Sequence, residues 1–408
     1  MAKSVVHYLC ILILCWFTCD CTVNYTKDNK TRNNANRIMV DDLLKDYHKA
    51  YRPIIDSTQV VEIRMKFSLL AISDVNVKEQ QLTAKGFFFL TWNDEFLTWN
   101  VTEYPVEEII MDSSQIWVPD LGIYNSLHEF PLSETFKVLI FPDGTAVSAP
   151  QKNYYISCNI HIQKYPFDKQ TCIFEVGSWF YRSKQLTVQP MDTKVDISLY
   201  KTNTAWYLDN TFVRKVNTTI NDSDMIHFGI DISRRSNYYV ANLIIPALSF
   251  PLLVNFAFLI PSVSGEKISF CAAVFLSFSV FINSVVDTLP VTSLETSYIA
   301  LFVHFQFLFG AIQTCLAVIV IRIGNREIVG KLSRFNIDLI NYGFFRAVFF
   351  CCIRRNKKDV TSSIKNIQTD GTGLTYIHLA NALDRMLLTT CLCISVGSSI
   401  TILFLMTT

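Results

Sequence analysis

The stretch Cys158-Asn-Ile-His-Ile-Gln-Lys-Tyr165-Pro166-Phe167-Asp168-Lys-Gln-Thr-Cys172 decides how the rest of this sequence is interpreted. Thirteen residues separate its two cysteines, and an aromatic-Pro-Phe-Asp core lies near the middle. A disulfide between the cysteines would close a compact loop, and a proline flanked by aromatic residues favours a rigid turn. The stretch therefore predicts a rigid, cross-linked loop.

The start of the chain predicts export. Residues 1–21 have the features of a secretory signal, with Lys3 followed by the apolar run Tyr8–Phe17, and an uncleaved membrane anchor is the alternative. Cleavage would leave Cys158 and Cys172 as the only cysteines before residue 238, so we expect them to form a disulfide. Sequons for N-glycosylation, all before residue 238, agree with export and begin at Asn24, Asn29, Asn100, Asn217 and Asn221.

The second half of the chain predicts four membrane spans. Four stretches lack Asp, Glu, Lys and Arg over a length that can cross the hydrocarbon core: about 238–262, 268–286, 296–321 and 386–408. The segment between the last two is basic, and the positive-inside rule places it in the cytoplasm. The net charge of +1 argues against a nucleic-acid partner. We expect a multi-pass protein of the plasma membrane, in contact with the lipid bilayer, with an extracellular N-terminus.

The part of the chain before the spans predicts an antiparallel β-sandwich. A short amphipathic helix is expected at 38–51, followed by alternating or apolar runs, such as 60–71, 81–92 and 116–118, that turn signals separate. The predicted fold class is an α+β membrane protein with an extracellular β-sandwich and a four-helix transmembrane bundle. Its expected parts are a signal peptide (1–21), the sandwich (22–237), three spans (238–321), a cytoplasmic segment with an amphipathic helix (322–385) and a last span (386–408).

These motifs together resemble the Cys-loop receptors, the pentameric ligand-gated channels that include the nicotinic acetylcholine receptors. Besides the Cys158–Cys172 loop, the matching motifs are Trp117-Val-Pro-Asp120, Gly177-Ser178-Trp179, Arg234-Arg235 and Gly265-Glu266-Lys267. The resemblance covers about residue 38 to the end. It implies four further subunits, identical or related, around a central pore, with small-molecule agonists bound between subunits.

The resemblance also implies which residues couple the two parts of the molecule. The expected coupling residues are Tyr165, Pro166, Phe167, Arg234 and Pro290. In relatives the arginine pairs with a glutamate in the turn between the first two strands, and here Glu79 is offset in that turn, which leaves the partner of Arg234 open. We find no metal-ligand spacing and expect no cofactor.

The second span has the pattern of a cation-conducting pore helix. Helical spacing gives one stripe that Glu266 and Asp287 bound, with members Ser269, Ala273, Leu276, Val280 and Asn283 or Ser284. In a five-fold assembly the two acidic residues would form carboxylate rings that attract cations. Leu276 and Val280 predict the closed gate, and plain helix packing is the alternative for both. Lys267 is the objection, and the resemblance implies that it turns away from the pore.

The predicted ligand site departs from the acetylcholine-binding pattern. The candidate ligand-binding residues are Tyr124, Trp179, Phe87, Phe89 and Phe212. Tyr124 and Trp179 match two positions of the aromatic box that holds a quaternary ammonium by cation–π attraction. A sandwich-core aromatic is the alternative for each, and also for Phe87, because strands favour aromatic residues. The third binding loop, between residues 206 and 228, lacks the vicinal cysteines and the tyrosines of acetylcholine-binding subunits. Together with the apolar run Phe87–Leu90 and the short cytoplasmic segment at about 322–375, this loop resembles that of the cephalopod chemotactile receptors, which are nicotinic-like subunits that detect poorly soluble molecules on contact.

Three functions remain open from the sequence. One is a homopentameric chemoreceptor channel that an apolar or amphipathic agonist, such as a terpenoid, opens to monovalent cations, with calcium permeability undecided. Another is an accessory subunit of a heteromeric nicotinic receptor that does not bind acetylcholine. The third is a non-conducting membrane adhesion or scaffold protein. An enzyme is not supported, because His161, His227 and His304 are scattered and no nucleophile–base set or phosphate-binding loop accompanies them.

Overall fold

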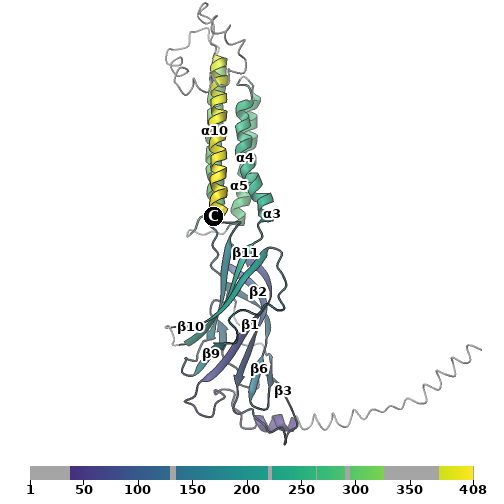
Figure 1. Ribbon diagram of the computed structural model, residues 1–408. Coiled ribbons are helices and arrows are strands. Elements are labelled where there is room, and N and C mark those ends of the chain that lie inside the picture. The colour runs from purple at the N-terminus through teal and green to yellow at the C-terminus, as the bar shows by residue number, and fades with distance from the viewer. Residues whose placement is uncertain are drawn as a thin grey trace, which may run out of the picture.

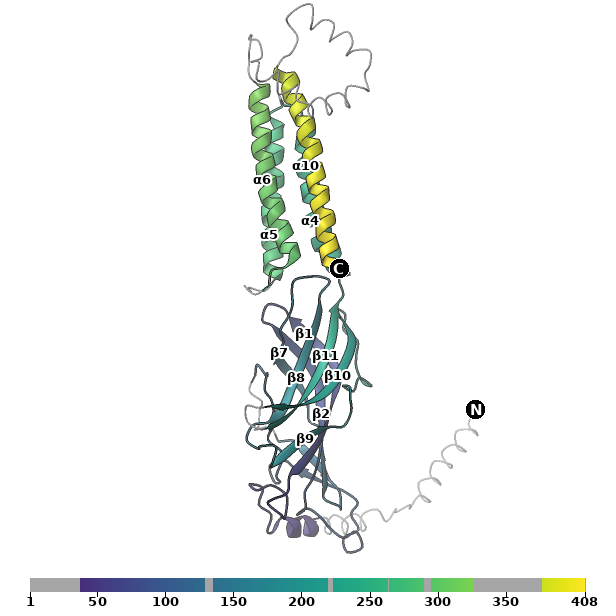
Figure 2. The ribbon, with the colours of Figure 1, turned by 60° about the vertical axis from the view of Figure 1, so that its left-hand side comes forward.

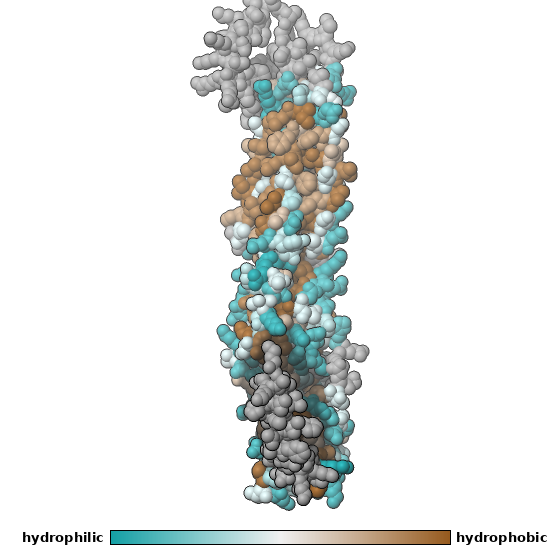
Figure 3. All heavy atoms as spheres, turned by 90° about the vertical axis from the view of Figure 1, so that its right-hand side faces the viewer, coloured by the Kyte–Doolittle hydropathy of each residue, from teal (hydrophilic) through white to brown (hydrophobic). Residues whose placement is uncertain are grey.

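The chain forms an elongated molecule with strands at one end and helices at the other (Figure 1). The computed structural model describes residues 37–128, 135–218, 223–262, 264–289, 295–325 and 376–407. In a space-filling view, apolar side chains cover most of the helical part, while polar side chains dominate the strand part (Figure 3). The two ends therefore suit lipid and water respectively, because a bilayer-exposed surface has to be apolar.

Two facing sheets make up the strand part, as predicted. The seven-stranded sheet has the order β3-β5-β6-β2-β1-β9, with β7 paired to β2, and the four-stranded sheet has the order β10-β11-β8-β4. All pairs are antiparallel except β1 with β9. The strands are β1 (Val61–Asn76), β2 (Gln81–Asn93), β3 (Ile109–Asp112), β4 (Leu121–Ile123), β5 (Lys137–Ile140), β6 (Thr145–Ser148), β7 (Gln151–Ser157), β8 (Lys169–Ser178), β9 (Leu186–Pro190), β10 (Trp206–Thr218) and β11 (Ser223–Arg234).

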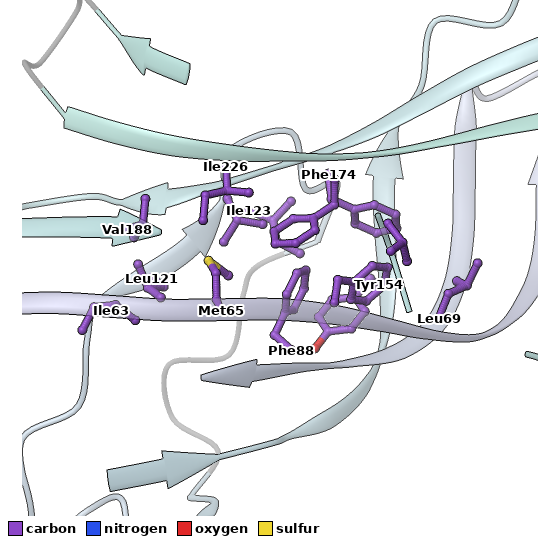
Figure 4. Close-up of a cluster of buried hydrophobic side chains, with 14 of the residues drawn as sticks. Ile63, Met65, Leu69, Phe88, Leu121, Ile123, Tyr154, Phe174, Val188 and Ile226 are labelled. Atoms are coloured by element: carbon purple, nitrogen blue, oxygen red, sulfur yellow. The ribbon is translucent and has the colours of Figure 1, made fainter. Parts of the chain in front are cut away.

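Aromatic and aliphatic side chains from both sheets fill the space between them (Figure 4). Phe67 stacks on Phe88 with ring centroids 4.5 Å apart, and it meets Phe174 of the other sheet at 4.8 Å. Each fully buried phenylalanine contributes about 1.5–3 kcal/mol relative to an exposed one. Because side chains alternate across a strand, burial of Phe88 turns Phe87 and Phe89 toward the outer face of β2.

Four helices long and apolar enough to span a membrane follow the sandwich, as predicted (Figure 2). The first, Asn237–Leu259, is continuous through α3 (Asn237–Tyr239), a π-helical turn (Val240–Ile244), α4 (Ile245–Asn255) and a short 3-10 turn (Phe256–Leu259). The others are α5 (Glu266–Thr288), α6 (Tyr298–Gly324) and α10 (Tyr376–Thr407). The expected amphipathic segment before the last span continues into it as a single helix.

Two local expectations were wrong. The helix expected at 38–51 spans residues 37–44 only, because Tyr47 turns into the sandwich, where its hydroxyl donates to Asp94 Oδ2 at 2.7 Å and accepts from the Trp117 amide at 2.9 Å. The run 116–118 is not a strand, although Trp117 is buried in the core. The expected signal peptide, Asn24, Asn29, Asn221, Pro290 and most of 322–385 lie outside the described residues.

Candidate ligand site, pore and coupling contacts

Tyr124 and Trp179 form the centre of the candidate ligand site. Their rings stack with centroids 4.3 Å apart and planes 19° from parallel. Tyr124 follows β4 and Trp179 follows β8, which are paired strands, and the Tyr124 hydroxyl donates to the Ser178 carbonyl at 2.5 Å. Trp179 is 48% exposed. This exposure disfavours the sandwich-core alternative for Trp179 and leaves an aromatic surface that a ligand can cover.

Asp120 and Gly122 hold this stack in place, a role that the sequence analysis did not assign to them. Asp120 accepts hydrogen bonds from Ser178 Oγ at 2.6 Å and from the Phe180 amide at 2.8 Å, which fixes the chain on both sides of Trp179. Gly122 leaves room for the indole, because a Cβ added there would lie 2.0 Å from Trp179 Nε1. Asp120 belongs to the Trp-Val-Pro-Asp motif, so the sequence contained a signal for it. The role of Gly122 follows only from its position against the Trp179 ring in the structure.

Phe87 and Phe89 lie on the other sheet, half-buried on the outer face of β2. The Lys66 ammonium, on the neighbouring strand, lies 5.6 Å from the centroid of the Phe89 ring and 3.8 Å from Asp196. The body of the sandwich separates these phenylalanines from the stack of Tyr124 and Trp179. One chain therefore presents two aromatic half-sites on opposite sheets and does not bring them together.

Phe212 is also not brought to the stack. It faces Gly229 across the β10–β11 pair and covers it, since a Cβ on Gly229 would lie 2.1 Å from Phe212 Cζ. Gly229 lies four residues along β11 from Met225, a separation of about 13 Å. Met225 pairs with Gly177 across β11 and β8, and a Cβ added to Gly177 would lie 3.0 Å from Met225 Cγ and 3.3 Å from Tyr124 Cε2. The hairpin therefore places a methionine beside the Tyr124 ring, and this methionine is only 5% exposed.

An ionic cluster fixes the hairpin of β10 and β11 to the seven-stranded sheet. Asp224, only 8% exposed, pairs with Lys215 at 2.6 Å and accepts hydrogen bonds from the hydroxyls of Thr187 and Ser183. Burial alone would raise the pKa of Asp224, but the hydrogen bonds from Lys215 and Thr187 outweigh it and lower that pKa. The Asp224 carboxylate is therefore charged at neutral pH and holds the hairpin close to its turn, where Asp224 pairs with Asn217.

A row of ionisable side chains crosses the four-stranded sheet near the stack. The strand register places Arg214, His227 and Glu175 side by side on β10, β11 and β8. Burial lowers the pKa of His227, an effect that Glu175 opposes and Arg214 reinforces. Its Nδ1 is buried and has no hydrogen-bond partner among the residues that the structure describes. His227 is therefore neutral at pH 7, between an acidic and a basic neighbour.

The predicted pore stripe occupies one exposed face of α5. Its members are all exposed in the single chain: Glu266, Ser269, Ala273, Leu276, Val280, Asn283, Ser284 and Asp287. The opposite face packs against the neighbouring helices through Cys271, Phe278 and Val285. Carboxylates are costly in hydrocarbon and usually face the interior of a bundle or a water-filled cavity. The exposed face of α5 is therefore better suited to a pore between subunits than to lipid.

Lys267 points away from this face. Its side chain is fully buried and its Nζ lies 2.5 Å from Oδ1 of Asp384 on α10. The same Nζ lies 5.6 Å from the centroid of the Phe258 ring. The positive charge beside Glu266 is thus paired inside the helix bundle and does not lie on the exposed face of α5.

Arg234 connects the end of β11 to the Cys158–Cys172 loop. Its guanidinium binds Asp168 through two contacts, Nε to Oδ1 at 2.7 Å and Nη2 to Oδ2 at 3.0 Å, and it stacks 4.2 Å from the Trp206 ring. Burial disfavours the charged guanidinium, but the Asp168 carboxylate outweighs this and raises the pKa of Arg234. The partner that the sequence left open is therefore Asp168, not Glu79.

The tip of the Cys158–Cys172 loop lies against the helices. The disulfide is formed as predicted, with the two Cα atoms 5.2 Å apart, and the Tyr165–Pro166 peptide is cis. Tyr165 is buried in the apolar cluster of the spans, 5.4 Å from the Tyr239 ring, and Phe167 packs against the same cluster. These expected coupling residues are thus located at the junction of the two parts.

The predicted modification sites within the described residues are accessible. Asn100 and Asn217 are both exposed, and the Thr102 hydroxyl of the first sequon donates to Asn100 Oδ1 at 2.8 Å. Within the described part of the chain, no cluster of three or more His, Cys, Asp or Glu side chains could hold a metal ion.

Known proteins match both parts of the chain. Residues 36–236 match the neurotransmitter-gated ion-channel ligand binding domain, and residues 243–331 match the neurotransmitter-gated ion-channel transmembrane region. The chain is 32% identical over 304 residues to the acetylcholine receptor subunit alpha-like of Manduca sexta, covering 71% of this chain and 59% of that protein. It is 30% identical over 291 residues to the neuronal acetylcholine receptor subunit alpha-2 of Homo sapiens, covering 70% of this chain and 55% of that protein.

The chain thus spans less than two thirds of the length of these relatives. The family consists of ion channels rather than enzymes. Its members, together with the four spans, identify a multi-pass plasma-membrane protein whose sandwich is extracellular. Both family matches lie on one chain, in the order of the observed sandwich and helices, and the chain therefore belongs to the neurotransmitter-gated ion-channel family as a nicotinic acetylcholine receptor-like member.

Proposed function

We propose that this chain is one subunit of a pentameric, cation-selective channel that an apolar or amphipathic small molecule opens. The observation that carries this proposal is the exposed face of α5, with Glu266 and Asp287 at its two ends while Lys267 is buried against Asp384. Five such faces around an axis would give two carboxylate rings, which concentrate cations and repel anions. Between the rings, Leu276 and Val280 would form the apolar constriction that closes the pore.

The division of the ligand site supports assembly in a ring. The stack of Tyr124 and Trp179 lies on the four-stranded sheet, and Phe87 and Phe89 lie on the outer face of the seven-stranded sheet. When one patch of a chain binds a different patch of the next copy, the copies form a closed ring if the rotations between neighbours add up to a full turn. A complete pocket would then form at every interface between neighbouring subunits.

The chemistry of these two patches favours an apolar agonist. A quaternary ammonium needs several aromatic faces around its charge. Here the residue of the hairpin beside the stack is the buried Met225, and Phe212 packs over Gly229 instead. On the facing patch the Lys66 ammonium already lies over the Phe89 ring and would repel a cationic ligand. An apolar ligand gains about 25 cal/mol for each Å² that it buries, and it needs no such box.

The test is whole-cell current from cells that express this chain alone. The compounds are acetylcholine, quinine as a bitter amine, and menthol as a sparingly soluble terpenoid. We expect a current in response to menthol, no response to acetylcholine, and loss of the response in Trp179→Ala. Replacing external sodium with N-methyl-D-glucamine should shift the reversal potential to negative values, and Glu266→Gln should weaken the selectivity for cations.

Other outcomes would assign the chain differently. Silence toward all compounds, with surface expression confirmed and with current restored by a related nicotinic subunit, would favour the accessory-subunit function. Within the described part of the hairpin, no aromatic side chain is placed beside the stack, which also fits that function. A response to acetylcholine alone would contradict the apolar agonist. Surface expression without current in any combination would favour the scaffold function.

A further inference from the structure

Two contacts cross from the Cys158–Cys172 loop to the start of α6, and neither belongs to the coupling set that the sequence suggested. His161 Nδ1 lies 2.7 Å from Glu295 Oε1, with the two side chains 66% and 36% exposed. Next to this pair, the Tyr298 amide donates to the Gln163 carbonyl at 3.0 Å, and Gln163 Nε2 donates to the Tyr298 hydroxyl at 2.9 Å. The loop is thus joined to the third span by one ionisable pair and two neutral hydrogen bonds.

A buried glutamine fixes the backbone of His161 from behind. Gln170 is 1% exposed, and its Oε1 accepts from the His161 amide at 2.8 Å. Its Nε2 donates both to the His161 carbonyl at 2.8 Å and to Asp168 Oδ2 at 2.7 Å. Asp168 in turn holds Arg234. A continuous chain of hydrogen bonds therefore runs from the end of β11 through the loop to His161, and Glu295 extends it to α6.

We infer that His161 and Glu295 form a proton-dependent contact that couples the extracellular domain to α6. This inference rests on the proposed function, because coupling has meaning only in a channel. A neutral imidazole can share one hydrogen bond with the carboxylate, whereas a protonated imidazole adds an ion pair to it. Histidine is the side chain whose charge ordinarily changes between pH 5 and 8, and the exposure of both partners gives protons direct access.

Other charged or titratable side chains lie on the loop itself, on β8, on the segment that joins β1 to β2, and on the helix side. The loop and β8 contribute Lys164, Lys169 and Asp168, of which Asp168 is bound to Arg234. β1 contributes Asp74, and the turn between β1 and β2 contributes Lys78 and Glu79. This turn touches the loop where the Cys158 amide donates to the Gln80 carbonyl at 2.9 Å. The helix side contributes Glu295, Tyr298 and Asp287, while residues 290–294 contain no ionisable side chain. Among the described residues, the ion pair of Glu295 is with His161.

The contact itself can be tested without any agonist or current. Hydrogen–deuterium exchange of residues 295–301 is measured on the full-length chain in lipid nanodiscs at pH 6 and pH 8, for wild type and His161→Gln. Glutamine retains a hydrogen bond but cannot gain a proton. We expect wild type to exchange about threefold more slowly than the variant at pH 6, and the ratio to fall toward one at pH 8. Equal ratios at both pH values would overturn the inference.

The coupling is tested by current in a background that conducts without agonist. Leu276→Ser places a hydroxyl in the apolar constriction, which should let water and ions pass spontaneously. In this background we expect the current to change about twofold or more between pH 8 and pH 6. Either His161→Gln or Glu295→Gln should remove that change, and the double variant should add nothing further. His161→Lys should hold the current at its acid value at every pH.

A matched control separates this site from other histidines. His128 is exposed in the same domain, where its ring meets Tyr155 at 4.5 Å, and His128→Gln should leave the pH response intact. A pH response that survives in His161→Gln would overturn the coupling. Absence of current in Leu276→Ser, with surface expression confirmed, would instead count against the pore, and the exchange measurement would still decide whether the contact exists.

Discussion

Lys267 illustrates at the scale of one residue how a buried pair sets the charge of a pore face. Its ammonium and the Asp384 carboxylate are both almost fully buried and neutralise each other. Removing only the lysine would leave a buried carboxylate without a counter-charge, which typically costs about 3–5 kcal/mol. We therefore predict that Lys267→Met strongly reduces the amount of folded full-length chain and lowers its thermal midpoint, measured by size-exclusion chromatography after heating in detergent.

Two further variants make this prediction specific. Lys267→Met combined with Asp384→Leu removes both charges and should recover most of the lost stability, because an apolar pair can replace a buried ion pair at little cost. Glu266 directly precedes Lys267 and lies on the exposed face of α5, so Glu266→Gln should leave the thermal midpoint unchanged. If Lys267→Met were as stable as wild type, the pair would not be needed to hold α10 against α5.

The roles of residues within a sequence motif could be predicted, whereas pairs that only tertiary packing brings together could not. The Cys158–Cys172 disulfide followed from the number and spacing of the cysteines, and the resemblance to a known family grouped Tyr124 with Trp179, whose rings stack in the structure. Asp384 could not be found in this way, because it lies 117 residues from Lys267 and only the packing of α10 places them together. His161 and Glu295 are likewise 134 residues apart.

At the scale of elements, the outer face of the four-stranded sheet has a built-in response to pH. Burial holds the pKa of His227 below its ordinary value, so the folded chain keeps the imidazole neutral where the unfolded chain binds a proton. Stability from this site is complete above the ordinary pKa of about 6.5 and is lost as the pH falls from there toward the folded pKa. We predict that the thermal midpoint falls less between pH 7 and pH 5 in His227→Gln than in wild type.

Differential scanning fluorimetry of the full-length chain measures this difference, with His128→Gln as the control for an exposed histidine. Equal falls in wild type and in His227→Gln would show that the imidazole is not held neutral by the sheet. The register of β10, β11 and β8 explains why the sequence did not reveal this row: its members come from three separate strands and become neighbours only once the sheet forms.

Strands and helices with a clear hydrophobic pattern were predicted well. Segments whose bounds depend on tertiary contacts were not. The alternation in β1 and β2 and the uncharged stretches of the four spans follow from burial and from the bilayer, so the sequence alone locates them. The helix at 37–44 ends earlier than its apolar spacing suggested, because Tyr47 instead bonds to Asp94 across the sandwich. Trp117 occupies the core from a loop, where residue type alone favoured a strand.

At the scale of the whole molecule, the proposed ring predicts that each ligand pocket is shared between two neighbouring subunits. If each pocket joins the Trp179 stack of one subunit to the Phe87 patch of the next, then Trp179→Ala and Phe87→Ala each damage every pocket of a homopentamer. Each variant alone should weaken the response to the activating compound by about tenfold or more, as truncation of a central aromatic contact usually does.

Cells that express both variants together should regain part of the response. In a randomly mixed ring, about one interface in four joins an intact Trp179 half-site to an intact Phe87 half-site. The measurement is whole-cell current after expression of the two variants at equal amounts, compared with each variant at the same total amount. No recovery on mixing, with both variants present at the surface in the same complexes, would mean that the two half-sites do not face each other, whereas recovery would establish a pocket shared between neighbouring subunits.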